Sequence, residues 1–393
     1  MASILSAGTT NSTALNLTAD NSGSLILASN NNVTAVTIDA NQNATFASSV
    51  NAPNTFGFKN RIINGAMVID QRNAGASITA STSALFSVDR WQTYSSPSSK
   101  FTVQQTPSAT ETGYATRVGA GFTNYLACTS SSAYTVTASD LFFVQQTIEG
   151  FNTADLAFGT ANAKSVTISF LVYSSLTGSF GASLQNGANN RSYPFSYTIS
   201  SANTWTQINV TIAGDTGGTW VGASNAGSMI IVFSLGMGST KSGTANAWVA
   251  GDYRSVTGAT SVVGTNGATF YITGVQLETG TKATSFDYRP YGTELSLCQR
   301  YFYRYTALVN SVIGRGYNTT GNVVMTRFSF PVTMRANPTA TLVGTFATVN
   351  TATVSIVEYD TSGVSIGLTV SSSGDAYFYA SASSQYFTAE SEL

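Results

Sequence analysis

The chain has 393 residues, of which 42% are hydrophobic, 9% are Asp, Glu, Lys or Arg, and none is histidine. The lack of histidine excludes histidine-based catalytic triads and most zinc enzymes, because histidine is the commonest general base and the commonest metal ligand. A formal net charge of −1 gives no electrostatic basis for binding nucleic acid, and we expect neither a cofactor nor a metal.

Short alternating segments recur near the start of the chain. Ala14–Leu17, Ser24–Leu27, Ala35–Ile38 and Ala44–Phe46 each alternate apolar and polar residues. This pattern predicts short strands with one buried face. Each strand has too few apolar side chains to be stable alone, so we predict that residues 1–57 form an N-terminal β-repeat stalk inside a homo-oligomer. A floppy polar leader is the alternative.

A hinge is predicted at Asn51–Asn54, after which the strands become longer and more aromatic. Val166–Val172 alternates cleanly, whereas Met229–Leu235 and Phe270–Leu277 are nearly continuous apolar runs. Such runs are typical of central strands that are covered on both faces. Gly and Asn clusters separate the strands, and helical periodicity is almost absent. Residues 58–290 are therefore predicted to form a large antiparallel β-sandwich, jelly-roll-like in its topology.

A short helix and a second set of strands are expected at the end of the chain. Thr293–Arg300 is the plausible helix, with Thr293 as its N-cap and Glu294 in its first turn. Strand patterns return after Tyr301. We predict a small C-terminal β-domain with one short helix at residues 291–393, so the fold class is all-β.

The charges of this C-terminal domain are unevenly distributed. Residues 295–357 contain arginines but no acid, and residues 358–393 contain acids but no base. The arginines are Arg300, Arg304, Arg315, Arg327 and Arg335, and the acids are Glu358, Asp360, Asp375, Glu390 and Glu392. We predict that the two halves face each other, within a subunit or between neighbours. The alternative is an arginine patch that binds phosphate or sulfate.

No catalytic residue is predicted. Without histidine, catalysis would need paired carboxylates, as in glycoside hydrolysis. Glu278 and Asp287 lie close to one strand end, but sequence does not give their separation in space. We interpret such carboxylates as groups that hold loops or pair with Arg90 or Arg289.

Carbohydrate binding needs less, because a flat aromatic face can stack on a sugar ring while neighbouring polar side chains hold its hydroxyls. Trp220 and Trp248 both adjoin glycine-containing loops, where the binding residues of a sandwich tend to lie. The predicted glycan-binding residues are Trp220, Trp248, Asn225, Asp252 and Tyr253. A core position is the alternative for each of these tryptophans. Trp91 and Trp205 lie inside alternating segments and are interpreted as core residues.

Several segments resemble a module found in bacteriophage tail-fibre and other virion proteins. The opening of the module is similar to NRIINGAMVIDQR at residues 60–72 and to VDRW at residues 88–91. Its close is similar to residues 270–280 (FYITGVQLETG), 283–291 (ATSFDYRPY) and 294–302 (ELSLCQRYF), and its acidic C terminus to residues 389–393 (AESEL). The resemblance covers about residues 60–393, with Asp287 at a position where Glu is more frequent.

The resemblance implies a jelly-roll sandwich akin to carbohydrate-binding modules, display on the virion surface and frequent trimerisation. It implies no established ligand. On this resemblance the recurring motifs are structural, with Trp91 in the core and Arg289 as a second structural residue. Gln276 and Glu278 would be polar members of one strand face that orient Arg90 or Arg289. A role for Gln276 and Glu278 in a sugar cleft is the sharper alternative.

These observations predict a non-enzymatic virion fibre or spike (tail fibre) subunit that binds host cell-surface glycans through its β-sandwich. We expect a homotrimer that contacts other virion proteins through residues 1–57, is made in the host cytoplasm and is displayed on the virion surface. The apolar runs are too short to span a membrane, so no membrane insertion is expected. The alternatives are a purely structural capsid-decorating, head-fibre or tail component without glycan binding, and a polysaccharide depolymerase.

Overall fold

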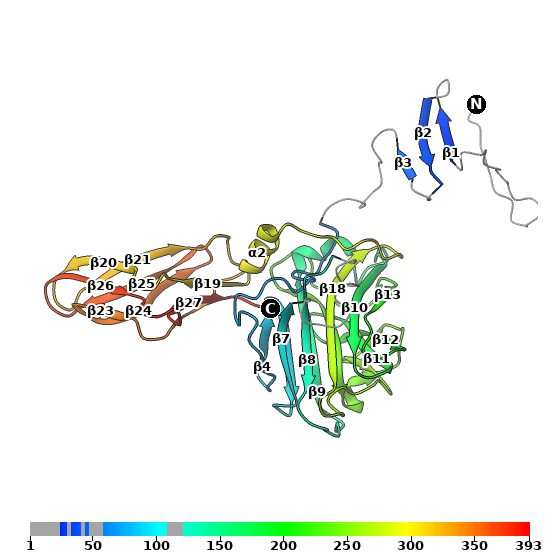
Figure 1. Ribbon diagram of the computed structural model, residues 1–393, viewed down its shortest axis with the longest axis horizontal. Coiled ribbons are helices and arrows are strands. Elements are labelled where there is room, and N and C mark those ends of the chain that lie inside the picture. The colour runs from blue at the N-terminus through cyan, green and yellow to red at the C-terminus, as the bar shows by residue number, and fades with distance from the viewer. Residues whose placement is uncertain (1–23, 30–32, 41–43, 47–57, 108–120) are drawn as a thin grey trace, which may run out of the picture. The chain divides into compact units, whose positions relative to one another are not determined.

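A computed structural model of the chain describes residues 24–29, 33–40, 44–46, 58–107 and 121–393 (Figure 1). The contacts divide the chain into two units, Met1–Phe56 and Gly57–Leu393. The described residues are mostly strands, which confirms the all-β class. The expected hinge at Asn51–Asn54 and the first repeat at Ala14–Leu17 lie outside the described residues.

The N-terminal unit contains a three-stranded antiparallel sheet. Its strands are β1 (Leu25–Ser29), β2 (Val33–Ile38) and β3 (Ala44–Phe46), paired in that order. The strand prediction is confirmed for these three repeats. Ile26 and Leu27 stay 56% and 47% exposed, because the described strands of this unit form a single three-stranded sheet. The oligomeric stalk remains a prediction.

Two large antiparallel sheets form the β-sandwich of the second unit (Figure 1). The first has six strands in the order β13 (Thr206–Ile212), β10 (Val166–Ser174), β18 (Thr269–Thr279), β8 (Asn124–Ser130), β7 (Phe101–Pro107) and β4 (Ile78–Thr79). The second has seven, in the order β16 (Val249–Ala250), β12 (Arg191–Ile199), β11 (Gly178–Asn186), β14 (Gly227–Met237), β9 (Leu141–Glu149), β6 (Trp91–Ser96) and β5 (Leu85–Val88). The connections carry short 3₁₀ turns at Gly150–Asn152, Ala154–Leu156 and Ser239–Lys241, and the two-residue parallel pair β15 (Ser242–Gly243) and β17 (Ser255–Val256).

The core lies between these sheets and follows the period-two pattern of the strands. On β10, the side chains of Val166, Ile168, Phe170 and Val172 all point into it. The expected central strands are also confirmed, since β14 lies between β11 and β9, and β18 lies between β10 and β8. Trp91 is fully buried in this core, and its indole Nε1 donates to the carbonyl of Asn64.

The helix α2 spans Tyr291–Gln299 and not the expected Thr293–Arg300. Thr293 is not its N-cap. The chain before the helix is extended at Pro290, whose ring fixes φ at −53°, and the helix begins immediately afterwards. Thr293 therefore lies within the first turn, where its amide donates to the carbonyl of Pro290. Glu294 lies in the first turn, as expected.

The strands after α2 form three three-stranded sheets. Their orders are β19-β27-β22, β20-β26-β23 and β21-β25-β24. The strands are β19 (Phe302–Thr306), β20 (Val312–Asn318), β21 (Val323–Ser329), β22 (Thr339–Val343), β23 (Ala347–Val349), β24 (Thr351–Asp360), β25 (Gly363–Val370), β26 (Gly374–Tyr379) and β27 (Tyr386–Glu390). A separate apolar core, which includes Val364, Ile366, Leu368 and Phe378, holds them together.

Two ion pairs join the arginine-rich and acid-rich halves of this C-terminal domain. Arg315 lies 2.6 Å from Asp375, and Arg327 lies 2.8 Å from Asp360. The halves therefore face each other within one chain, as the charge distribution predicted. Both pairs are exposed, so each contributes little to stability.

The C-terminal domain is tied to the sandwich by a small buried cluster. Cys298, Tyr301 and Leu393 pack against Ile63 and Ile69 of the segment that precedes the sandwich strands. Both parts belong to one unit, and the contacts do not divide it at residue 290.

We expect Gly65→Ala to destabilise the sandwich by about 3 kcal/mol, since overpacking of a close contact costs this order of energy. A Cβ atom at Gly65 would lie 2.1 Å from the backbone oxygen of Val275, and the amide of Val275 also donates to the carbonyl of Gly65. Urea denaturation would measure the loss. Gly222→Ala is the matched control, because a Cβ there meets no atom within 4 Å. Equal stabilities of the two variants would contradict the prediction.

Candidate functional site

The outer face of the six-stranded sheet carries a cluster of four aromatic side chains. Tyr125 comes from β8, Tyr173 from β10 and Tyr271 from β18, while Trp205 immediately precedes β13. The rings of Tyr173 and Tyr271 are stacked at 5.1 Å, and Trp205 lies 5.6 Å from both Tyr125 and Tyr173. We call these four residues the aromatic cluster.

Strand register explains why these residues meet. Core residues occupy alternate positions on β10, so Ser169, Leu171 and Tyr173 point to the opposite face. Tyr173 pairs directly with Tyr271 across the sheet. The expectation that Trp205 is a core residue is wrong, because its ring is half-exposed and packs on this outer face.

A groove of about 530 Å³ adjoins the aromatic cluster on the same face. Ser169 and Leu171 of β10 pair with Asn209 and Gln207 of β13, and all four side chains line the groove. The amides of Gln207 and Asn209 are exposed. None of the described residues that line the groove is charged. The groove thus offers amides and hydroxyls beside aromatic rings.

The loop at residues 283–288 forms one wall of the groove. Its aromatic side chains Phe286 and Tyr288 pack with Phe122, at ring distances of 4.9 and 5.4 Å from it. Phe122 lies against Gly274, where a Cβ would be only 2.5 Å from the ring and where φ is +63°. A side chain at position 274 would therefore prevent Phe122 from packing this close to the sheet.

Gln276 and Glu278 anchor this loop. Glu278 accepts hydrogen bonds from the amide and the hydroxyl of Thr284, and Gln276 accepts one from the amide of Asp287. Gln276 also donates to Glu278 at 2.8 Å. No hydrogen bond or ion pair joins either residue to Arg90 or Arg289 within the described chain, so the expectation that they orient those arginines is wrong. They position the wall of the groove and do not line it.

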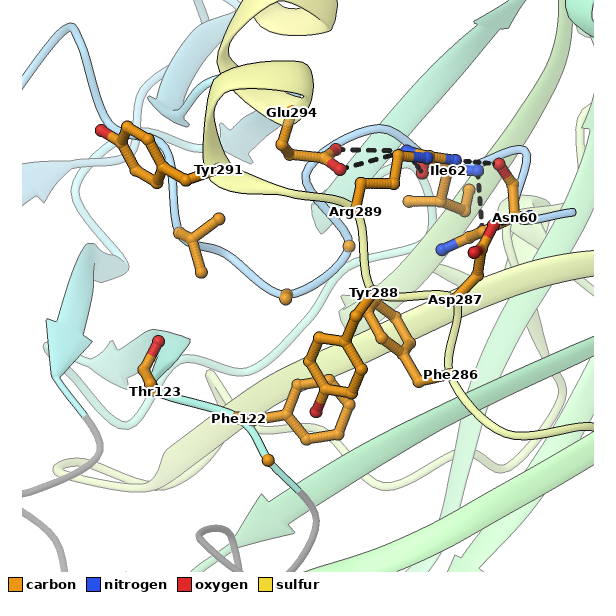
Figure 2. Close-up of a pocket in the computed structure, with 14 residues that line it drawn as sticks. Asn60, Ile62, Phe122, Thr123, Phe286, Asp287, Tyr288, Arg289, Tyr291 and Glu294 are labelled. Atoms are coloured by element: carbon orange, nitrogen blue, oxygen red, sulfur yellow. Dashed lines mark hydrogen bonds and ion pairs between the residues drawn. The ribbon is translucent and has the colours of Figure 1, made fainter. Parts of the chain in front are cut away.

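A second pocket, of about 280 Å³, lies on the other side of the same aromatic wall (Figure 2). Arg289 spans it, donating to the carbonyls of Asn60 and Ile62 and to the carboxylate of Glu294. Asp287 accepts a hydrogen bond from the amide of Asn60. Both carboxylates of this pocket are thus engaged in holding the segment around residue 60, and Arg289 has a structural position.

The expected tryptophan pair lies elsewhere, at one end of the core. Trp220 and Trp248 meet at 5.5 Å with perpendicular rings, and Phe158 packs edge-on against both. The indole of Trp220 donates to Asp215, and that of Trp248 donates to the carbonyl of Ala213. Both rings are half-buried. Trp205 is buried to a similar degree, so burial does not separate the two aromatic sites, and the indole N–H groups of this pair are used in internal hydrogen bonds.

The other three expected binding residues do not join the indoles through any hydrogen bond in the part of the chain described. The side-chain amide of Asn225 donates to the carbonyl of Arg335, and the Arg335 guanidinium donates to the carbonyl of Asn225, so Asn225 links the sandwich to the C-terminal domain. Asp252 is held by Lys241 and Arg254 at 2.7 and 2.9 Å. Burial alone would raise the pKa of Asp252, but these cations hold it below its usual value. Tyr253 packs between Gly243 and Gly251.

The described residues contain no group of His, Cys, Asp and Glu side chains suited to holding a metal ion. They also contain no helix long and apolar enough to cross a membrane. The groove offers exposed amides and hydroxyls in an uncharged setting. Of the aromatic cluster, Tyr125 and Tyr173 are buried, so only the partly exposed rings of Trp205 and Tyr271 offer stacking surface.

No protein-family model and no curated protein matches the chain, but solved structures do. A putative sugar-binding protein from Bacteroides thetaiotaomicron is 12% identical with a TM-score of 0.31, covering 56% of this chain and 100% of that one. A family 11 carbohydrate-binding module from Clostridium thermocellum, in complex with a β-1,3-1,4-mixed-linked tetrasaccharide, is 11% identical with a TM-score of 0.26, covering 53% and 98%. The enzymatically active domain of bacteriophage CBA120 tailspike protein 4 is 11% identical with a TM-score of 0.27, covering 56% and 22%.

The chain is thus distantly similar in structure to carbohydrate-binding-module β-sandwiches and to a phage tailspike domain, and it is assigned to no family. Little more than half of the chain takes part in these similarities. They describe the architecture of the sandwich and identify no ligand or binding residue in it.

Proposed function

We propose that this chain is a non-enzymatic subunit of a bacteriophage fibre or spike whose β-sandwich binds a host surface glycan along the outer face of the six-stranded sheet. The observation that carries the glycan part is the pair of partly exposed rings in the aromatic cluster, Trp205 and Tyr271, on the same face as an uncharged groove with exposed amides. Aromatic faces stack on sugar rings, and amides hold their hydroxyls. The virion part rests on the sequence motifs that open and close the second unit.

The lining of the groove favours a neutral stretch of glycan. Gln207, Asn209, Ser169, Thr284 and Ser285 supply its polar atoms, and no described lining residue carries a charge. A hydrolase would need two carboxylates in the cleft, and the described lining contains neither Asp nor Glu. Binding without cleavage is therefore the better-supported function.

Single sugar contacts are weak, so the proposal includes several copies of the chain in each fibre. A homotrimer attached to other virion proteins through residues 1–57 would multiply the contacts and supply avidity. Its place would be the virion surface, after synthesis in the host cytoplasm.

We expect the full-length chain to bind neutral bacterial surface oligosaccharides on a glycan array, and Trp205→Ala to weaken that binding at least about tenfold. Removal of a central aromatic anchor commonly costs more than the roughly 1.4 kcal/mol that corresponds to tenfold. Tyr317→Ala is the control, because Tyr317 is an exposed aromatic residue of the C-terminal domain.

Trp248→Phe separates the two aromatic sites. Loss of binding in this variant, with Trp205→Ala unchanged, would move the site to the tryptophan pair that the sequence indicated. Failure of the wild-type chain to bind any glycan would leave the purely structural virion component as the better reading. The exposed apolar side chains of Val323, Met325 and Val357 on the C-terminal domain favour that second candidate, since they offer a surface for a neighbouring protein.

A further inference from the structure

A cavity of about 320 Å³ lies between the sandwich and the C-terminal domain, away from the groove. One side comes from the Arg72–Asn73 turn and β5, and the other from the sheet β19-β27-β22. Two arginines, Arg72 and Arg304, line it together with one carboxylate, that of Glu390. The volume is at the lower end of the range for small-molecule sites, which begins at about 300 Å³.

The charge of Arg72 is paired in this cavity, although its buried Nε has no hydrogen-bond partner. Its guanidinium makes ion pairs with Glu390 at 3.1 Å and Glu392 at 3.0 Å, and it stacks on the ring of Phe302 at 3.7 Å. Glu392 also pairs with Arg90. Arg72 therefore anchors the C-terminal segment to the sandwich, and its charge is compensated.

Arg304 has no such compensation. Its guanidinium lies 3.7 Å from the centre of the Tyr386 ring, and its Nη1 atom makes only long contacts, of 3.5 and 3.4 Å, with the carbonyls of Gln71 and Arg72. No carboxylate of the described residues lies within ion-pair distance of it, and its buried Nε has no hydrogen-bond partner.

The ion pairs of the cluster leave Arg304 without an anion of its own. Arg72 and Arg90 pair with Glu390 and Glu392, and Arg304 pairs with neither of these carboxylates. The uncompensated charge is held on the cavity wall by β19, whose Arg304 pairs in register with Thr388 of β27. The hydroxyl-bearing Thr388 lines the same cavity.

We propose that this cavity binds a small oxyanion group, a carboxylate, sulfate or phosphate, through the free edge of the Arg304 guanidinium. The planar guanidinium of arginine can donate two parallel hydrogen bonds to the oxygens of a carboxylate, sulfate or phosphate. Its stacking on Tyr386 fixes the direction in which these N–H groups point. The site is separate from the glycan groove and does not depend on it.

Isothermal titration of the full-length chain with sodium sulfate, sodium phosphate and D-glucuronate tests the proposal. D-glucose is the neutral counterpart of glucuronate, and sodium chloride at equal ionic strength controls for salt. We expect at least one oxyanion to bind and glucose not to bind. Binding of the inorganic anions indicates a general oxyanion site, and binding of glucuronate alone indicates an acidic sugar.

Arg304→Gln should weaken that binding at least about tenfold, because a charge-assisted hydrogen bond is lost. Arg304→Lys keeps the positive charge but loses the planar guanidinium. This variant should bind the oxyanion with intermediate affinity, even if the Gln variant is unstable. Arg315→Gln is the matched control, since Arg315 is exposed in the same domain and paired with Asp375. No oxyanion binding by the wild type, equal binding of glucose, or unchanged affinity in both Arg304 variants would overturn the proposal.

Discussion

Arg90→Met is expected to lower the free energy of unfolding by about 3–5 kcal/mol, the usual cost of removing one partner from a buried ion pair. The side chains of Arg90 and Glu392 are 2% and 5% exposed. Arg90 also donates to the carbonyl of Thr147 at 2.5 Å and lies over the ring of Tyr301 at 3.6 Å. Methionine keeps the unbranched stem at this left-handed position, where φ is +73°, so the loss measures the charge.

Urea denaturation, followed by far-UV circular dichroism, would measure this loss against Arg315→Met. The Arg315–Asp375 pair is 64% and 44% exposed, so its removal should cost much less than the removal of Arg90. Adding Glu392→Leu to the Arg90→Met variant should not restore the stability fully, because Arg72 also loses its ion pair with Glu392. A loss in Arg90→Met no larger than in the control would contradict a buried electrostatic junction between the two domains.

The strands and the core could be predicted from the sequence because their signal is local. The alternation in Val166–Val172 and the apolar run in Phe270–Leu277 specify which faces are buried, and the structure places both strands next to each other in the sheet. Trp91 lies in the core for the same reason. The start of α2 was misplaced because Pro290, and not the side chain of Thr293, sets it.

The aromatic cluster could not be predicted because it depends on register between strands far apart in the chain. Tyr125, Tyr173, Trp205 and Tyr271 meet only when four strand segments are aligned. The sequence did contain part of the information needed to place Trp205. The apolar positions Ile208, Val210 and Ile212 place residues 205, 207 and 209 on the opposite face, so the same alternation assigns Trp205 to the surface.

The C-terminal contacts were foreseen as a charge pattern but not as particular pairs. Arg315 pairs with Asp375 and Arg327 pairs with Asp360, and both acids lie in the acid-rich half that the charge distribution indicated. Arg300 instead pairs with Glu149 of the sandwich. Arg304 and Arg335 make no ion pair with a described acid, and the guanidinium of Arg335 donates to backbone carbonyls instead. These outcomes depend on the packing of the two domains, which the charge pattern does not give.

Asp89 makes the stability of this junction depend on pH. Burial raises the pKa of Asp89 to about 7, against the opposing effects of a hydrogen bond from Gln71 and the charge of Arg72. A folded-state pKa above the unfolded value means that the folded chain holds the proton more tightly. The stability contributed by this group is therefore fully present below about pH 4 and is lost as the pH rises through 7.

Other carboxylates change the stability in the opposite direction, and they do so at lower pH. Burial alone would raise the pKa of Glu149, but hydrogen bonds from Arg300 and Tyr301 hold it below its usual value. The pKa of Asp215 is likewise lowered, because the hydrogen bonds from Arg191 and Trp220 outweigh its burial. Their contributions are lost as the pH falls toward and below about 4. The chain has no histidine, so no imidazole titrates between these two windows.

The free energy of unfolding should therefore fall by about 2 kcal/mol between pH 5.5 and pH 8, since one pKa unit corresponds to about 1.36 kcal/mol. Asp89→Asn should remove this fall, whatever the mutation does to the absolute stability, because the neutral amide binds no proton. Urea titrations of both proteins at pH 5.5, 6.5, 7.5 and 8 give the two slopes, and any group that titrates elsewhere contributes equally to each. A wild-type stability that is flat or rising over this range, or an unchanged slope in Asp89→Asn, would show that Asp89 is already ionised in the folded chain. The carboxylate would then be a third acid opposing Arg72 and Arg90, and the excess positive charge at Arg304 would be correspondingly smaller.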